Sequence, residues 1–77
     1  MTISIQLKLN ASLRRFAPPA SDHYPIEKGL TIRRLIARLG ISSEEVKLIF
    51  IDNAKASLDS VLGGGERVAI FPPIGGG

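Results

Sequence analysis

The sequence predicts an α+β domain in which a mixed sheet of four to five strands carries one amphipathic helix across one face. Three patterns support this. Apolar and polar residues alternate over residues 3–10, apolar residues recur at helical spacing over 32–39, and a short, mostly apolar run at 67–71 closes on two prolines. A period of two indicates a half-buried strand, whereas i, i+3, i+4, i+7 spacing indicates one apolar helix stripe. If the first and last strands pair at the centre of the sheet, the architecture is a β-grasp.

Composition limits the chain to one small domain. It has 77 residues, of which 44% are hydrophobic and 22% charged, and this balance is typical of a folded protein. We expect one domain over residues 1–71 and a flexible tail over residues 72–77. Residues 1–4 lack the basic start and apolar run of a signal peptide, and no apolar stretch approaches membrane-spanning length. The expected compartment is therefore the cytoplasm, without membrane attachment.

Two residue counts exclude whole classes of chemistry. The chain has no cysteine, so it offers neither a thiolate nucleophile nor a cysteine-based metal site. Its single histidine, His23, cannot build a metal site or a catalytic triad alone. We expect no metal and no bound cofactor, and we assign His23 no role.

The net charge of +3 raises the question of nucleic acid binding. The aromatic residues do not form a stacking motif, and neither a helix-turn-helix pattern nor zinc-finger spacing is present. We therefore expect no nucleic acid partner. The clustered arginines suit a solvated face or a docking surface for an acidic partner; they are Arg14, Arg15, Arg33, Arg34 and Arg38.

The first third of the chain predicts two strands and an ordered loop. Alternating Ile3, Ile5, Leu7 and Leu9 predict the first strand. Residues 11–20 end on two prolines and predict a loop whose Leu13 and Phe16 plug the edge of the core. Residues 23–28 predict a second strand, with Tyr24 and Ile26 on one face and Pro25 placing it at the sheet edge.

The middle of the chain predicts a helix of about two and a half turns. Thr31 is the expected N-cap, and Gly40 occupies the position of a left-handed C-terminal cap. Ser42 and Glu45 have the spacing of a capping box, which predicts one further helical turn. The apolar stripe consists of Ile32, Leu35, Ile36 and Leu39.

The remainder predicts the other half of the sheet. Residues 46–51 predict a third strand and residues 54–57 a minor strand, while the spacing of Leu58 and Leu62 predicts a short helical turn beneath the core. Residues 63–65 are glycines and predict a tight turn, not a phosphate-binding loop, because the Lys and Ser/Thr of the Walker pattern do not follow. The last strand, 67–71, should face the helix with Val68 and Ile70, opposite Ile5 and Leu7. Its Phe71 alternates to the outer face, where it either contacts a partner or covers the sheet edge.

The tail that follows, Pro72-Pro73-Ile74-Gly75-Gly76-Gly77, can present its own carboxylate. The prolines lack N–H groups, cannot continue a ladder and should direct the chain away from the body. Residues 74–77 would then extend about 13–14 Å, and glycines pass through a channel too narrow for other residues. The alternative is a frayed end without function.

Several segments together resemble the MoaD/ThiS family, the ubiquitin-like small sulfur carriers of molybdopterin and thiamin biosynthesis. The most specific is Phe71-Pro72-Pro73-Ile74-Gly75-Gly76-Gly77, and the others are shared by β-grasp proteins in general: Ala11–Phe16, Gly29–Ile32, Leu39–Ile41 and Glu66–Ile70. The Pro-Pro spacer favours the molybdopterin-synthase small subunit. Gly75 stands where that subunit often has Ala or Ser.

The resemblance implies a carried substrate without catalytic side chains. A ubiquitin-activating-type enzyme would use ATP and magnesium to adenylate the Gly77 carboxylate, and a persulfide donor would convert it to a thiocarboxylate. Gly76 would lie in the enzyme's channel. Partner contacts would come from Phe71, Pro72, Pro73, Ile74 and Gly75. In molybdopterin synthesis the tail would enter a large synthase subunit, with this chain as the small subunit.

Other functions fit the same residues. A ubiquitin-like modifier would use activated Gly77 to form an isopeptide bond with a lysine, and a thiamin or other carrier would pass its sulfur elsewhere. The third alternative is a β-grasp interaction module whose tail has no chemistry.

Overall fold

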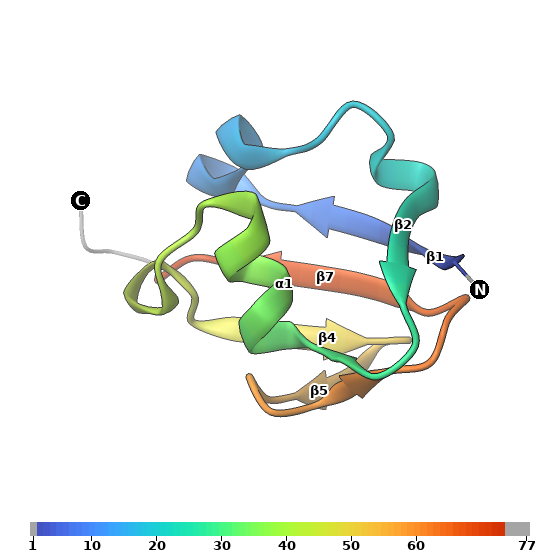
Figure 1. Cartoon of the computed structure of the whole chain (residues 1–77). Helices are drawn as coiled ribbons and strands as arrows, with labels where there is room; N and C mark the ends of the chain where they lie inside the picture. Colours follow the sequence, from blue (N-terminus) through green and yellow to red (C-terminus); the bar gives the residue numbers. More distant parts are fainter. Residues whose placement is uncertain (1, 74–77) are drawn as a thin grey trace.

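The computed structural model describes residues 2–73, and these form a five-stranded sheet with one α-helix across one face (Figure 1). The strand order is β2-β1-β7-β4-β5. β1 and β7 run parallel, whereas the other neighbours are antiparallel. The predicted mixed sheet is confirmed, with the first and last strands side by side. The bounds are β1 (Thr2–Leu9), β2 (Tyr24–Glu27), β4 (Leu48–Ile51), β5 (Ala54–Ala56), β7 (Arg67–Phe71) and the helix α1 (Ile32–Leu39).

The core forms where the apolar faces of β1 and β7 meet α1. The parallel register sets Leu7 beside Val68 and Leu9 beside Ile70. Since side chains alternate along a strand, these four point to the same face, and all are buried. On the helix, Leu35 is fully buried and Ile36 is 2% exposed, while Leu39 packs against the core only in part. The predicted stripe therefore meets the predicted strands.

Both ends of α1 are capped as the sequence predicts. The Thr31 hydroxyl accepts a hydrogen bond from the Arg34 N–H at 3.2 Å. Gly40 adopts φ +84°, and its N–H bonds back to the last turn. A side chain is disfavoured at that φ, so the glycine ends the helix cleanly.

Short 3-10 helices fill the edges of the sheet. They are η1 (Ala11–Phe16), η2 (Ser21–His23) and η3 (Ser43–Glu45). Leu13 of η1 is 1% exposed and Phe16 packs on the core, so both residues cover the edge of the core as predicted. The capping box of Ser42 and Glu45 is present, and the strand that follows begins at Leu48, two residues later than predicted, because the Val46 N–H closes η3 on the Ser43 carbonyl.

The predicted helical turn at Leu58 and Leu62 is wrong. Leu62 instead lies in β6 (Val61–Leu62), which pairs with β3 (Leu30–Thr31) as a second, two-stranded sheet. Carbonyl groups of this segment accept from the start of α1: Ser60 from the Ile32 N–H at 3.0 Å and Leu58 from the Arg33 N–H at 2.8 Å. The first N–H groups of a helix lack internal partners. The observed path is a turn at Leu58 and Asp59 followed by β6, and it leaves the Leu58 and Ser60 carbonyls available to these N–H groups, whereas a helical turn would use its carbonyls internally.

The glycine turn at residues 63–65 is confirmed, and it binds a carboxylate of its own chain. Glu66 accepts from the Gly63 and Gly64 N–H groups, both at 2.7 Å. Gly64 has φ +110°, and a Cβ there would lie 2.7 Å from Cδ1 of Ile3. The turn therefore requires glycine at 64, and Glu66 occupies the two N–H groups that an anion would need.

Candidate functional site

The candidate site begins where β7 ends, because this strand leads into the Pro-Pro-Ile-Gly-Gly-Gly segment. Asn10 donates two hydrogen bonds to the Ile70 carbonyl, one from its backbone N–H and one from Nδ2, each 3.1 Å long. The Lys47 N–H donates to the Phe71 carbonyl at 2.8 Å. The last two carbonyls of β7 are thus held from both sides, and the segment beyond them starts from a fixed point in the centre of the sheet.

The two prolines differ in burial. Pro72 is buried and Pro73 is exposed. Neither has an N–H to continue the ladder with β1 or β4, which explains why β7 stops at Phe71. The other predicted site residues, Ile74, Gly75, Gly76 and Gly77, lie outside the described residues, as does most of the predicted tail.

The face of the sheet opposite α1 carries an apolar cluster next to this exit point. Phe71 packs edge to face against Phe50, with ring centroids 5.8 Å apart and an interplanar angle of 89°. Leu48 pairs with Phe71 across β4 and β7 and is 36% exposed. We call Leu48, Phe50 and Phe71 the open-face cluster. Phe71, the predicted contact residue, is therefore one member of a larger apolar surface.

Lysines flank the open-face cluster within the sheet. Lys8 lies beside Ala69, Ala69 beside Phe50, and Phe50 beside Lys55, so the row runs across four strands with a lysine at each end. Both lysines are exposed. A partner with an apolar centre and acidic residues at its rim matches this row.

Three of the five clustered arginines form ion pairs with carboxylates of the same chain. Ion pairs join Arg15 to Glu45 at 3.2 Å, Arg33 to Asp59 at 3.1 Å and Arg38 to Glu27 at 2.9 Å. Arg38 donates a hydrogen bond to the Glu27 carboxylate, which raises the pKa of Arg38. These ion pairs are largely exposed. They neutralise three of the clustered arginines, so the surface of α1 and η1 is a solvated face and not a concentrated cationic site.

Within residues 2–73, no group of three or more His, Cys, Asp or Glu side chains is placed to hold a metal ion. His23 is exposed, at the end of η2. Across the same described part of the chain, no helix has the length and apolar character needed to cross a membrane.

Sequence reasoning missed three residues of the site: Asn10, Lys47 and Phe50. Phe50 could have been found, because it alternates with Ile49 and Ile51 as Phe71 does with Ile70. Lys47 acts through its backbone N–H, and Asn10 through its backbone N–H and its side-chain Nδ2; both contacts depend on the position of β7, for which no local sequence signal exists.

A family model described as the ThiS family matches residues 7–77. The match covers most of the chain, including β7 and the glycine run. No curated protein matches the chain.

Solved structures share the fold over nearly the whole chain. A putative molybdopterin converting factor, subunit 1, from Pyrococcus furiosus is 25% identical, with a TM-score of 0.64, covering 94% of this chain and 99% of that one. SAMP1 from Haloferax volcanii is 20% identical, with a TM-score of 0.63 and coverage of 96% and 99%. The Haloferax volcanii HVO 2177 protein is 24% identical, with a TM-score of 0.67 and coverage of 99% and 88%.

Proposed function

The chain belongs to the ThiS family, and from this premise we propose that it is a sulfur carrier for molybdopterin biosynthesis. In this proposal Gly77 is the carboxy-terminal residue, and its carboxylate is adenylated and then converted to a thiocarboxylate. Family membership and the ubiquitin-like fold support the coarser statement, a small carrier or modifier of the MoaD/ThiS type. The molybdopterin assignment is supported by the likeness to the Pyrococcus furiosus protein and by the Pro-Pro spacer.

The observation that carries the proposal is the clamped end of β7. Asn10 and Lys47 fix the carbonyls of Ile70 and Phe71, and the prolines then release the chain from the sheet. A reactive group must reach a partner's active site in a defined position, since a displacement of about 1 Å can cost on the order of a hundredfold in rate. A rigid origin leaves only the short segment beyond it to be oriented by the partner.

The proposed chemistry uses the chain only as an acyl donor. The Gly77 carboxylate attacks the α-phosphorus of ATP in the activating enzyme, and pyrophosphate leaves. The terminal sulfur of a persulfide then attacks the acyl carbon and AMP leaves. A second thiol cleaves the resulting acyl disulfide, which gives the thiocarboxylate and a protein disulfide. Every cysteine involved belongs to partners, since this chain has none.

The open-face cluster is the proposed docking surface for the activating enzyme. Its aromatic pair joins Phe71, the last residue of β7, to Phe50 of the neighbouring strand β4, on the face of the sheet opposite α1. Aromatic residues dominate the binding energy of many interfaces. An enzyme seated on Leu48, Phe50 and Phe71 would hold the carboxylate near its ATP site, and a large synthase subunit could use the same surface afterwards.

The test combines activation with mass analysis. The chain ending at Gly77 is incubated with a ubiquitin-activating-type enzyme from the same genome, ATP and magnesium, and pyrophosphate exchange is measured. A persulfide donor is then added. We expect exchange first and then a mass gain equal to replacement of one oxygen by sulfur, with molybdopterin formed when the large synthase subunit and its pterin substrate are supplied. The Gly77 deletion is the control, and exchange with that deletion would contradict the proposal.

The modifier function begins with the same adenylate, so only later steps separate the two. The chain shares its fold with a protein described as a modifier, Haloferax volcanii small archaeal modifier protein 1, at 18% identity. Tryptic remnants of residues 68–77, which follow the last arginine of the chain, on lysines of cellular proteins, without a thiocarboxylate on the free chain, would replace the carrier proposal with the modifier. If the transferred sulfur supports formation of thiamin but not of molybdopterin, the carrier proposal stands and only the assigned sulfur acceptor changes.

A further inference from the structure

The end of β7 is held by residues at the boundaries of two 3-10 helices, η1 and η3. Asn10 is the N-cap of η1, and Lys47 follows Val46, the C-cap of η3. The N–H groups of Asn10 and Lys47 donate to the carbonyls of Ile70 and Phe71. The position of this strand end therefore depends on where η1 and η3 lie relative to each other.

An ion pair joins these two helices directly. Nη2 of Arg15 in η1 donates to Oε2 of Glu45 in η3 at 3.2 Å. The other oxygen of the same carboxylate, Oε1, accepts from the Ser42 N–H at 3.2 Å as part of the capping box. The Arg15 guanidinium lies over the Phe16 ring, 4.8 Å from its centroid. Each partner is thus oriented by a contact beside its own helix, and the two side chains meet between the helices.

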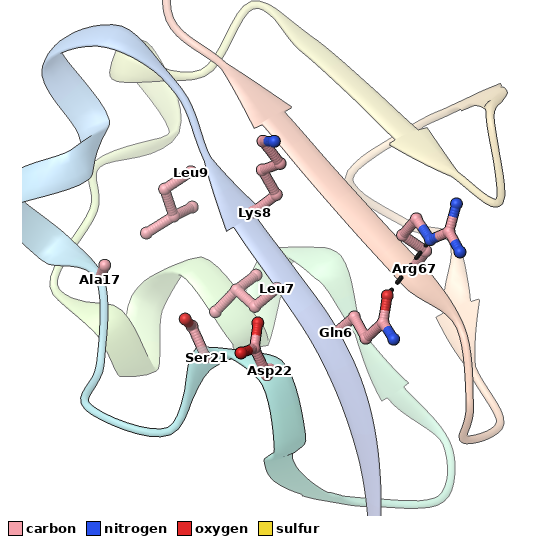
Figure 2. Close-up of a pocket in the computed structure, with 8 residues that line it drawn as sticks. All are labelled: Gln6, Leu7, Lys8, Leu9, Ala17, Ser21, Asp22 and Arg67. Carbon is pink, nitrogen blue, oxygen red and sulfur yellow. Dashed lines mark hydrogen bonds between the residues drawn. The ribbon is translucent and has the colours of Figure 1, made fainter.

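The two ends of η1 differ in how they are supported. Leu13, in its first half, is 1% exposed in the core. At its end Phe16 packs on the core only in part, and the next residue, Ala17, borders a hollow of about 470 Å³ that β1 lines on the other side (Figure 2). The chain packs closely on β1 again at η2. The ion pair between Arg15 and Glu45 therefore ties down the end of η1 that packing supports least.

Together these contacts form a closed circuit, which we call the exit bracket. It runs from the end of β7 through Asn10 and η1 to Arg15, across the ion pair to Glu45, and through η3 and Lys47 back to β7. Its other links are backbone hydrogen bonds or the chain itself, whereas the ion pair joins side chains that are 68% and 37% exposed. An exposed ion pair changes an equilibrium by about fivefold at most. That is a small contribution to folding, but it is enough to set how often the bracket is closed.

We propose that Arg15 and Glu45 are positioning residues for activation, because their ion pair closes the exit bracket and so holds Asn10 and Lys47 against the end of β7. The inference rests on the proposed function, in which the segment beyond β7 enters the activating enzyme. When the ion pair opens, the end of η1 shifts and the hydrogen bonds to the last two carbonyls of β7 loosen. The enzyme then binds the open-face cluster as before, but the carboxylate occupies its reactive position less often.

The first test measures pyrophosphate exchange of the full chain with the activating enzyme. Arg15→Gln removes one charge of the pair, and Glu45→Gln removes the other while keeping an oxygen for the Ser42 N–H. We expect each variant to lower kcat about twofold to fivefold and to leave KM for the chain unchanged. Arg15→Lys keeps the charge and should restore most of the parental kcat. The double variant should lose no more than either single variant, because both changes remove the same interaction.

The second test uses the free, isotope-labelled chain and needs no enzyme. Amide hydrogen exchange reports how often a backbone hydrogen bond opens. We expect the amides of Asn10 and Lys47 to exchange about twofold to fivefold faster in Arg15→Gln, and amides in the middle of β7 to be unchanged. Arg33→Gln is the matched control, because it breaks an exposed ion pair of 3.1 Å, with Asp59, that lies outside the exit bracket. It should leave kcat and the amide exchange at their parental values.

Three outcomes would overturn the proposal. They are unchanged exchange of the Asn10 and Lys47 amides in Arg15→Gln, additive losses of kcat in the double variant, and an equal loss of kcat in Arg33→Gln. A rise in KM with kcat unchanged would also overturn it, by making Arg15 a docking contact. If the parent chain is not activated at all, the proposed function fails, and the amide exchange still decides whether the ion pair holds the end of β7.

Discussion

The two faces of β7 differ in what they contribute to the protein. Toward α1 the strand presents Val68 and Ile70, both fully buried. Toward the opposite side it presents Ala69 and Phe71, both partly exposed, and Phe71 stacks with Phe50. Successive residues of one strand therefore serve stability and recognition in turn. Substitutions on the helix side should change unfolding, and those on the open face or beyond the strand should change activation.

The largest effect should come from the segment beyond β7. In Gly76→Val, a β-branched side chain enters a channel proposed to fit only backbone, and φ is restricted. Deleting Gly77 withdraws the carboxylate by roughly 3.5 Å. We expect each change to lower the rate of pyrophosphate exchange by a hundredfold or more, on the order set by misplacement of reacting groups.

Melting curves are the control for these two changes, and the melting temperature should stay within error of the parent. Gly75→Ala should be tolerated, since related tails carry small side chains there. A Gly76→Val protein activated at the parental rate would disprove the narrow channel, and a collapse of its melting temperature would make the segment structural.

Leu35→Ala tests the helix face. Leu35 is fully buried at the centre of the α1 stripe, and removing it should lower the free energy of unfolding by about 2–5 kcal/mol. Denaturant unfolding measures this loss. Below its melting temperature the variant should still be activated at the parental rate, because its open face is unchanged. An unaltered midpoint would contradict the packing of α1 on β1 and β7.

Phe50→Ala tests the open face. Loss of its ring removes one half of the aromatic pair, and we expect a rise in KM for the chain, as a substrate of the activating enzyme, of about fivefold to thirtyfold. The free energy of unfolding should fall by up to about 1.5 kcal/mol for loss of the aromatic pair. Loss of the partly buried surface of the Phe50 ring adds a further contribution. Phe16→Ala is the matched control, because Phe16 packs on the core at η1 and should affect unfolding without raising KM. Equal KM values for both variants would remove the open-face cluster as a docking surface.

The smallest effect should come from Asn10→Ala, which removes the Nδ2 donor without placing another polar atom against the Ile70 carbonyl. The Ile70 carbonyl retains its bond from the Asn10 backbone N–H, so unfolding should lose only about 0.5–1.5 kcal/mol. If the clamp positions the carboxylate, kcat for activation falls several-fold while KM is unchanged. A change in KM alone would show that Asn10 acts through docking.

Most elements could be predicted because each rests on a local pattern. Alternation placed β1 and β7, and helical spacing with Thr31 and Gly40 placed α1 to within a residue. The segment from Leu58 to Leu62 was predicted wrongly, since two leucines four residues apart satisfy helical spacing whether or not a helix forms. Its path, a turn at Leu58 and Asp59 followed by β6, depends on β3 and on the N–H groups at the start of α1, which lie about thirty positions away in the chain.

By itself, the sequence determined the α+β class, the helix stripe and the glycine segment after a Pro-Pro stop, because backbone preference and short-range periodicity encode them. Only the tertiary structure decided which residues gather around that stop. The register of β4 on β7 sets Phe50 against Phe71, and the end of β1 brings Asn10 to Ile70 across sixty positions. These contacts join distant parts of the chain through pairing and packing, and no pattern within one segment specifies them.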